Sequence, residues 1–363
     1  MAKKKHLLLG TVDVGWRIKQ FQRFAKDHLS DRLESSSLVY YHVPSSVHRT
    51  AYDRPYNIHH RPKWTRLPIK LMEFFRALII FDQFHFISGE TLLNRRLRRW
   101  EFRCYKWLGK ELTMHFVGSD IRDPYRVFDQ EERLVRGQLP EKSESLDWQR
   151  RLIEDAETYA HHILVSTPDL LDVCPQAVYY PVLIDLEDLG ELIPDVEEKK
   201  SDEEILIVHA PSNPAIKGSA AIDSVMKNIL DETTLPVRYI NTAHTDELGP
   251  DSQYNLSRQS LFQLYRQAHI VIDQMLIGWY GLQALEALMC NCQVITYIRP
   301  DLESHLAKGC PIRSSSLYDL ENTMRTAIDQ VRAGGYDHRA GRKWVLEEHT
   351  IDENHQALLD CWL

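Results

Sequence analysis

Short apolar runs alternate with amphipathic stretches along most of the chain, and this pattern predicts two successive α/β layers. The expected strands of the first half are His6–Leu9, Leu38–His42, Ile79–Phe86, Leu112–Phe116, His161–Ser166 and Gln176–Tyr180, and its expected helices are Arg17–His28, Ile69–Ala77 and Asn94–Leu108. The expected strands of the second half are Ile205–His209, Val237–Ile240, the run that ends before Asp273, and Gln293–Ile298, and its helices are expected from about Lys217, at Ser257–Gln267 and at Leu282–Met289. Such alternation is typical of parallel sheets that are covered by helices and bind ligands at the carboxyl ends of their strands.

An acidic stretch with few core residues, DLEDLGELIPDVEEKKSDEE, separates the two halves. The chain has 363 residues, more than one hydrophobic core usually serves. We therefore expect one domain over residues 1–183, a second over residues 184–340, and a terminal segment over residues 341–363.

The composition is that of a globular protein, with 43% hydrophobic and 26% charged residues. Its six cysteines are scattered without the spacing of metal ligands, which favours reduced thiols in the cytoplasm. The basic start, MAKKKHLLLG, has too short an apolar run for a signal peptide, and no run reaches the length of a membrane span. A cytoplasmic protein is expected, peripheral to a membrane at most.

The net charge of −8 conceals an asymmetry along the chain. Residues 1–110 carry 22 Lys and Arg against 9 Asp and Glu, whereas the remainder carries 22 against 43. A basic amino-terminal half indicates an anionic partner, and an anionic lipid surface or a pyrophosphate-linked acceptor suits it. The sequence has no RNP, zinc-finger or helix-turn-helix signature, so nucleic acid is not the expected partner.

The helix expected at Asn94–Leu108 concentrates this basic charge. Apolar residues recur there at steps of four, three, four and three, namely Leu93, Leu97, Trp100, Cys104 and Trp107. Such a helix either lies on an anionic membrane with its aromatic side chains at the headgroup level, or packs its apolar stripe on a sheet as amphipathic helices commonly do. The sequence leaves both interpretations open.

The most informative stretch runs from Val271 to Ile298 and reads as strand, glycine turn, helix and strand. Gly278 and Gly281 come just ahead of the helix, where glycines let a phosphate approach the exposed N–H groups and the positive end of the helix dipole. Glu286 lies about one and a half turns further in, where a carboxylate can accept hydrogen bonds from a ribose. The alternative is an ordinary αβ unit with an incidental glutamate.

This stretch resembles the nucleotide-sugar site of retaining glycosyltransferases of family 4. Their pattern is Glu, Pro, Phe, Gly, four residues and Glu, and here Gly278, Trp279, Tyr280, Gly281 and Glu286 stand in these places. The first glutamate of the family pair is therefore absent, so contacts to a donor sugar are expected from the backbone, from the two aromatic residues or from the facing domain. The resemblance implies the α/β GT-B fold, with two Rossmann-like doubly wound parallel-sheet domains facing a cleft and a C-terminal helix that crosses back to the first domain.

Two loops of the first domain are further candidates. Gly10 and Gly15 allow a close backbone approach in the loop Gly10–Arg17, and Asp13 is a candidate donor ligand there, although a structural turn explains this loop equally well. The loop HFVGSDIR resembles a family run in which a histidine precedes the glycine, and here Val117 replaces it. Ser119 and Asp120 remain candidate catalytic residues of this loop, with a helix-capping role as the alternative for the aspartate.

The loop HAPSNPAIKG in the second domain supplies the strongest candidate cation. Lys217, followed by Gly218, matches the family lysine that pairs with the donor pyrophosphate, and Asn213 is a further candidate for donor binding. The companion arginine of the family is replaced by Ser212. An ammonium group near a helix start offsets charge on a leaving group.

The resemblance implies a glycosyltransferase that moves a sugar from a nucleotide-diphosphate sugar to an acceptor hydroxyl with retention of configuration. Its acceptor would be a saccharide or a lipid-linked molecule, as in bacterial surface polysaccharide or glycoconjugate synthesis. Lys217 would offset charge on the pyrophosphate, Gly281 would offer its N–H, and Glu286 would bind the ribose. Ser119 and Asp120 would lie across the cleft, and neither a metal nor another cofactor is implied.

Two other functions compete with this interpretation. An inactive binding or scaffold partner of a glycosyltransferase is favoured by the departures at Val117, Ser212 and Gly278, and is opposed by the retained Lys217 and Glu286. A sugar-nucleotide epimerase would require a cluster of acids and histidines in the cleft, which the sequence lacks.

Overall fold

The computed structural model describes residues 4–41, 52–93, 95–123, 145–190, 192–193, 204–243 and 256–363. These residues form two compact α/β units. Unit 1 holds the described residues up to Arg122, those from 145 to Asp185, and Asn354–Leu363, while unit 2 holds Asp123 and the described residues from Leu186 to Glu353. The second unit thus resumes at Leu186, whereas the sequence placed the boundary between residues 183 and 184.

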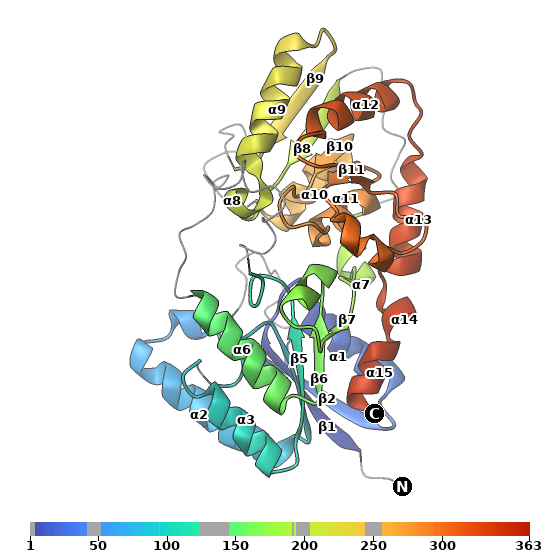
Figure 1. Ribbon diagram of the computed structural model, residues 1–363. Coiled ribbons are helices and arrows are strands. Elements are labelled where there is room, and N and C mark those ends of the chain that lie inside the picture. The colour runs from blue at the N-terminus through green and yellow to red at the C-terminus, as the bar shows by residue number, and fades with distance from the viewer. Residues whose placement is uncertain are drawn as a thin grey trace. The chain divides into compact units, whose positions relative to one another are not determined.

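Unit 1 is built on a parallel sheet with the strand order β3-β2-β1-β4-β5-β6-β7. Its strands are β1 (Lys5–Val12), β2 (Leu33–Tyr41), β3 (Arg54–Pro55), β4 (Gln83–Ile87), β5 (Glu111–Phe116), β6 (His162–Val165) and β7 (Val178–Tyr179). Its helices include α1 (Arg17–His28), α2 (Lys63–Ile80), α3 (Arg98–Trp107), α6 (Ser145–Tyr159) and α15 (Gln356–Trp362). Helices α2, α3 and α6 cover one face of the sheet (Figure 1).

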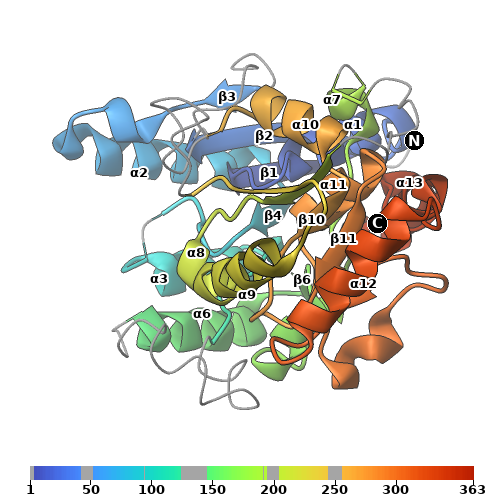
Figure 2. The same ribbon diagram turned by 90° about the horizontal axis from the view of Figure 1, so that it is seen from above.

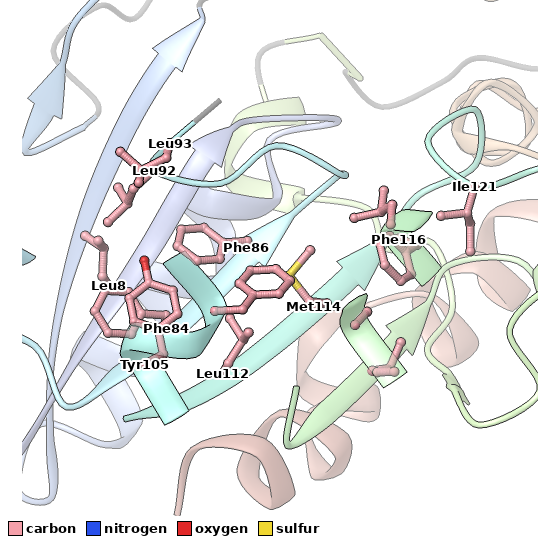
Figure 3. Packing of buried hydrophobic residues seen from close by; sticks show 14 of the residues in the cluster. Leu8, Phe84, Phe86, Leu92, Leu93, Tyr105, Leu112, Met114, Phe116 and Ile121 are labelled. Atoms are coloured by element: carbon pink, nitrogen blue, oxygen red, sulfur yellow. The ribbon is translucent and has the colours of Figure 1, made fainter. Parts of the chain in front are cut away.

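Side-chain alternation along the strands divides the core of unit 1 between the two faces of its sheet. Leu8, Phe84, Phe86 and Met114 point toward α2, α3 and α6, and they pack with Tyr105 in one cluster (Figure 3). The neighbouring strand residues, such as His85, point to the other face, which is covered by α1 and α15. Both faces are therefore covered, as expected for a parallel sheet that is buried on both sides.

The C-terminal segment completes this second face. Trp362 of α15 is fully buried, and its indole N–H donates to His85 Nδ1 at 3.0 Å, while its carbonyl accepts from Gln83 at 3.0 Å. The expectation that the chain end packs on the first domain thus holds for residues 354–363. The earlier part of the segment belongs to unit 2, because Gly341 in α13 (His338–Glu348) packs so closely on Leu288 that an added Cβ would lie 2.8 Å from it.

Two helices of unit 1 depart from the sequence expectations. Helix α2 runs through Pro68 to Ile80, so Ile79 is helical and solvent-exposed rather than part of a strand. Proline lacks the N–H for one helical bond, but α2 continues around it because Phe74 and Ala77 anchor the helix on the sheet. Helix α3 buries Arg98, Glu101, Phe102 and Tyr105. Of the predicted stripe, Leu93, Leu97 and Cys104 pack on the core, whereas Trp100 and Trp107 are exposed.

Unit 2 is built on a second parallel sheet with the strand order β12-β11-β10-β8-β9. Its strands are β8 (Ile205–His209), β9 (Val237–Asn241), β10 (Ile270–Ile272), β11 (Gln293–Thr296) and β12 (Arg313–Ser314). Its helices include α7 (Leu186–Leu189), α8 (Pro214–Lys217), α9 (Ser219–Glu232), α10 (Arg258–Gln267), α11 (Leu282–Met289), α12 (Leu320–Arg332), α13 and α14 (Ile351–Asn354). Helices α9 and α12 lie side by side on one face of this sheet (Figure 2). No helix within the described residues is long and apolar enough to span a membrane.

Candidate functional site

A buried ion pair connects two strand ends of unit 2 with the start of α11. Asp273 follows β10 directly, and its carboxylate accepts from Lys217 Nζ at 2.5 Å and from the Gly281 N–H at 3.0 Å. Lys217 ends α8, in the segment that follows β8, and it also donates to Gln283 Oε1 at 3.1 Å. Asp273 is 0% exposed and Lys217 8% exposed. The carboxyl ends of parallel strands are where ligands bind in sheets of this type.

The loop that carries Lys217 is held by two further polar contacts. Asn213 caps α8 by accepting from the Ile216 N–H at 3.4 Å, so its side chain has a structural role there. His209, at the end of β8, contacts Ser219 Oγ at 2.8 Å and the carbonyl of Ile272 at 2.9 Å. Burial lowers the pKa of His209 to about 4, so this histidine is neutral at physiological pH.

Glu286, expected to bind a ribose, is engaged in an ion-pair chain. Arg258 of α10 donates to Glu286 Oε1 at 3.1 Å and also pairs with Asp188 of α7. Burial raises the pKa of the Glu286 carboxyl, and the neighbouring Arg258 opposes this by favouring the ionised form. Through Arg258 the carboxylate is thus part of a contact that joins α7, α10 and α11.

The position of the missing family glutamate is occupied by a neighbouring side chain. Gly278 has φ +84°, and a Cβ added there would lie 2.5 Å from Cγ of Arg299 and 2.6 Å from its Cδ. The Arg299 guanidinium extends to Asp301, and its backbone N–H donates to the Gly278 carbonyl at 3.0 Å. Only glycine is compatible with this backbone conformation and this close contact.

The two aromatic residues after Gly278 belong to the core of unit 2. Trp279 is 0% exposed and Tyr280 1% exposed, and their rings stack with centroids 4.9 Å apart. The Tyr280 hydroxyl contacts His349 Nε2 at 3.2 Å, and the Trp279 carbonyl accepts from Gln274. Both rings are thus covered by other residues of the protein, and a contact of their side chains with a donor sugar stays a prediction.

In unit 1 the first candidate loop is shorter than predicted, because Gly10 lies inside β1, where an added Cβ would come within 3.1 Å of the Leu38 carbonyl. Asp13 is buried and accepts from the Tyr52 hydroxyl at 2.7 Å and from the Ile18 N–H at 3.1 Å, so it fixes the start of α1. Burial raises the pKa of its carboxyl, while the Tyr52 hydrogen bond acts in the opposite direction. Gly15 takes a positive φ of 65° in the turn. These contacts favour the structural interpretation of this loop.

The loop after β5 is likewise organised by its aspartate. The Asp120 carboxylate accepts from the N–H groups of Val117 at 2.9 Å and Gly118 at 2.8 Å, which precede it in the loop, so it has a structural role although it caps no helix in the described residues. Burial raises the pKa of Asp120 while these hydrogen bonds oppose the rise. Ser119 is exposed and free of this role, whereas His115 is fully buried and contacts Ser166 at 3.0 Å, so it does not replace the family histidine.

Several residues of these sites escaped the sequence analysis. Asp273 had a usable signal, because a polar residue directly after a buried parallel strand lies at the ligand-binding edge of the sheet. Arg258, Asp188 and Arg299 had no such signal in the sequence. Each lies far along the chain from the residue that it contacts, which is Glu286 for Arg258, Arg258 for Asp188 and Gly278 for Arg299.

No family model and no curated protein matches the sequence. Similar solved structures include Anabaena HepE in complex with UDP-glucose, with 11% identity over 99% of both chains and a TM-score of 0.59. Sucrose-phosphate synthase from Thermosynechococcus elongatus has 12% identity over 99% of this chain and 97% of its own, with a TM-score of 0.57. A glycosyltransferase from Rickettsia africae has 10% identity over 100% and 98%, with a TM-score of 0.58. These likenesses confirm the GT-B fold.

Proposed function

We propose that this chain is a glycosyltransferase whose unit 2 binds a nucleoside-diphosphate sugar at Lys217 and the start of α11. The observation that carries the proposal is the buried ammonium of Lys217 beside a helix start, at the carboxyl end of β10. Anionic groups are stabilised at helix starts by exposed N–H groups and the helix dipole. The likeness to HepE, a protein solved with UDP-glucose, and the retained Lys217, Gly281 and Glu286 support this assignment.

The reaction breaks the bond between the anomeric carbon and the pyrophosphate oxygen, and forms a bond from the anomeric carbon to an acceptor hydroxyl oxygen. The nucleoside diphosphate leaves with the bonding electrons, and the hydroxyl proton is released. Lysine has three N–H donors, and Asp273 and Gln283 accept two of them in Lys217. The third is available to a phosphate oxygen, whose charge grows as the sugar leaves. We assign the reaction to the retaining class, in line with the family 4 resemblance.

We propose other N–H groups than that of Gly281 for the contact with the pyrophosphate. Gly281 donates its N–H to Asp273, so this group reaches a phosphate only if the carboxylate moves away. The N–H groups of Leu282 and Gln283 come next along α11, within the first turn, where a helix offers no acceptor of its own. We assign the phosphate contact to this first turn together with Lys217.

For the acceptor we propose a saccharide or a lipid-linked molecule, consistent with a role in surface polysaccharide or glycoconjugate synthesis in the cytoplasm. The basic charge of residues 1–110 supports an acceptor that carries phosphate. Neither a metal nor another cofactor enters the proposed step, in which Lys217 supplies the positive charge.

A second candidate function is binding of a nucleotide sugar without turnover, as a partner of an active transferase. The observation that favours it is the Asp273 carboxylate, which neutralises Lys217 and occupies the Gly281 N–H. The closed position at Gly278 supports it further, because no acid faces the donor sugar from there.

Calorimetry against a panel of nucleoside diphosphates, followed by a donor-turnover assay, separates the two candidates. Binding with turnover supports the enzyme, binding without turnover supports the partner, and no binding contradicts both. Lys217→Ala is expected to lower turnover by about a hundredfold or more, comparable to the loss of one transition-state donor. Lys227→Ala, an exposed lysine of α9 in the same unit, is the matched control. An unchanged rate in Lys217→Ala removes this lysine from the mechanism.

A further inference from the structure

Helix α2 of unit 1 turns its more apolar face to solvent. The side chains that it buries include Lys70 and Glu73, whereas Trp64 is 79% exposed and Ile79 84% exposed. Met72 and Phe75 are also more than half exposed. The four apolar residues follow at steps of eight, three and four, which places them along one side of the helix. Ordinary surface helices have the opposite arrangement.

Helix α3 extends this apolar side. Trp100 is 45% exposed and Trp107 84% exposed, and Trp100 contacts Phe75 with ring centroids 6.5 Å apart. The two helices lie next to each other on the same face of the sheet (Figure 1), and Lys110, just after α3, donates to the carbonyl of Phe81 at the end of α2. Six exposed apolar residues of the two helices therefore form one surface, which we call the aromatic patch: Trp64, Met72, Phe75, Ile79, Trp100 and Trp107.

The exposed charges of these two helices all have one sign. Their two acids, Glu73 and Glu101, are buried, where the first pairs with Arg54 at 2.7 Å and the second accepts from the Leu93 N–H at 2.9 Å. The charged residues that remain at least partly exposed are Lys63, Arg66, Arg76, Arg99, Arg103 and Lys106. Arg99 also approaches Asp155 of α6 at 3.5 Å. The helices thus present cations and apolar groups with no acid of their own.

Two arginines of this region have structural contacts. Arg98 is 2% exposed and donates to the Gly89 carbonyl, and Arg95 stacks on Trp148 at 3.7 Å. These two residues hold the loop before α3, so they are unsuitable for testing a surface function. Arg99, Arg103 and Lys106 are exposed on the surface of α3. Arg103 donates to the Tyr159 hydroxyl at 3.2 Å and the Lys106 ammonium lies 5.7 Å from the centre of that ring, but these contacts hold no loop, so the three residues suit that purpose.

We propose that the aromatic patch docks unit 1 on an anionic lipid bilayer. Tryptophan and phenylalanine side chains favour the boundary between headgroups and acyl chains, and the flanking lysines and arginines are attracted to anionic headgroups. Neither the aromatic nor the basic side chains alone anchor a protein firmly, and here both kinds lie on the same two helices. The positive charge of these helices matches an anionic lipid surface. This docking does not rest on the transferase activity, because no residue of the patch belongs to unit 2.

Co-sedimentation with phosphatidylcholine vesicles, with and without phosphatidylglycerol, tests the proposal on the full chain. We expect sedimentation only with the anionic vesicles, weakening as salt is added. The variant Trp64→Ser/Phe75→Ser/Ile79→Ser should bind at least tenfold more weakly. Neutralising Arg99, Arg103 and Lys106 to Gln should weaken binding by about fivefold for each charge removed.

Matched controls come from unit 2. Tyr318→Ser removes an aromatic side chain that is 67% exposed, and the triple change of Lys227, Arg332 and Lys343 to Gln removes three exposed charges. Both controls should sediment as the wild type does. All substituted residues of the patch are exposed, and circular dichroism verifies that each variant is folded.

Three results overturn the proposal. The first is that the wild type does not sediment with the anionic vesicles, and the second is that the patch variants sediment as well as the wild type does. The third is light scattering that shows a dimeric wild type and a monomeric apolar variant, because the patch would then bind a second copy of the chain. Nucleoside-diphosphate binding, measured by calorimetry, should be equal in the wild type and the apolar variant. That measurement separates a failure of docking from a failure of the proposed transferase function.

Discussion

The ion pair between Lys217 and Asp273 allows a sharp test of the donor site through Asp273→Asn. Asp273 is fully buried and receives the Lys217 ammonium at 2.5 Å and the Gly281 N–H at 3.0 Å. Asparagine keeps the shape, but it has one acceptor oxygen and no charge, so the ammonium loses its counter-ion. Removing one partner of a buried pair costs about 3–5 kcal/mol, which lowers the melting temperature of a unit of this size by roughly 6–20 °C.

The same substitution should tighten the binding of UDP. In the wild type the Asp273 carboxylate neutralises Lys217, whereas the variant presents a net positive charge and releases the Gly281 N–H to a phosphate. Unit charges about 5 Å apart in an effective dielectric of about 20 interact by roughly 3 kcal/mol. This limits the gain to about a hundredfold in Kd, and we expect at least about tenfold.

Calorimetry and thermal unfolding with and without UDP measure both effects in the same protein samples. UDP should raise the melting temperature of Asp273→Asn more than that of the wild type, because at a given ligand concentration the stabilisation of the folded state grows as Kd falls. Asp231→Asn removes an exposed acid of α9 and is the control for charge alone. Equal or weaker UDP binding by the folded Asp273→Asn variant would refute the reasoning, and Asp273 would then organise the phosphate site rather than compete with phosphate.

Two further predictions concern stability. Gly278→Ala should lower the melting temperature more than Gly309→Ala. Both glycines have a positive φ, at 84° and 77°, but an added Cβ would meet Arg299 at position 278 and open space at position 309. Equal losses of melting temperature would show that the Arg299 side chain moves aside without cost. Unfolding in urea should show that the free energy of unfolding falls as the pH drops from about 6.5 toward 4. Burial lowers the pKa of His209 to about 4, so in this range the unfolded chain takes up a proton that the folded chain excludes. The expected loss in the free energy of unfolding is about 3 kcal/mol. His209→Gln should remove that part of the pH dependence, and an unchanged slope would contradict it.

Several elements were predictable from local pattern because their neighbours in sequence are also their neighbours in space. The helix Arg17–His28, the strand Ile205–His209 and the helix Leu282–Met289 have the predicted bounds. Their apolar spacing is set by the period of one element, so it needs no knowledge of the rest of the fold.

Local pattern was insufficient where the partner surface decides the outcome. The step pattern of Trp100 and Trp107 identified an amphipathic helix but not which side meets the sheet, and the sheet selected Phe102 and Tyr105 instead. Ile79 was assigned to a strand because a short apolar run has no period of its own, and only the anchoring of α2 made it helical.

The sequence by itself determined that Lys217 follows a strand and precedes a helix, and that Gly281 and Glu286 frame the start of α11. Only the tertiary structure decided the state of these groups. Asp273 lies 56 positions from Lys217 along the chain, and no local rule links the two. Their pairing arises because parallel strands bring distant chain segments to one edge of a sheet, where buried charges must find partners. For the same reason Gly278 is a position closed by Arg299, and not simply one that lacks an acid.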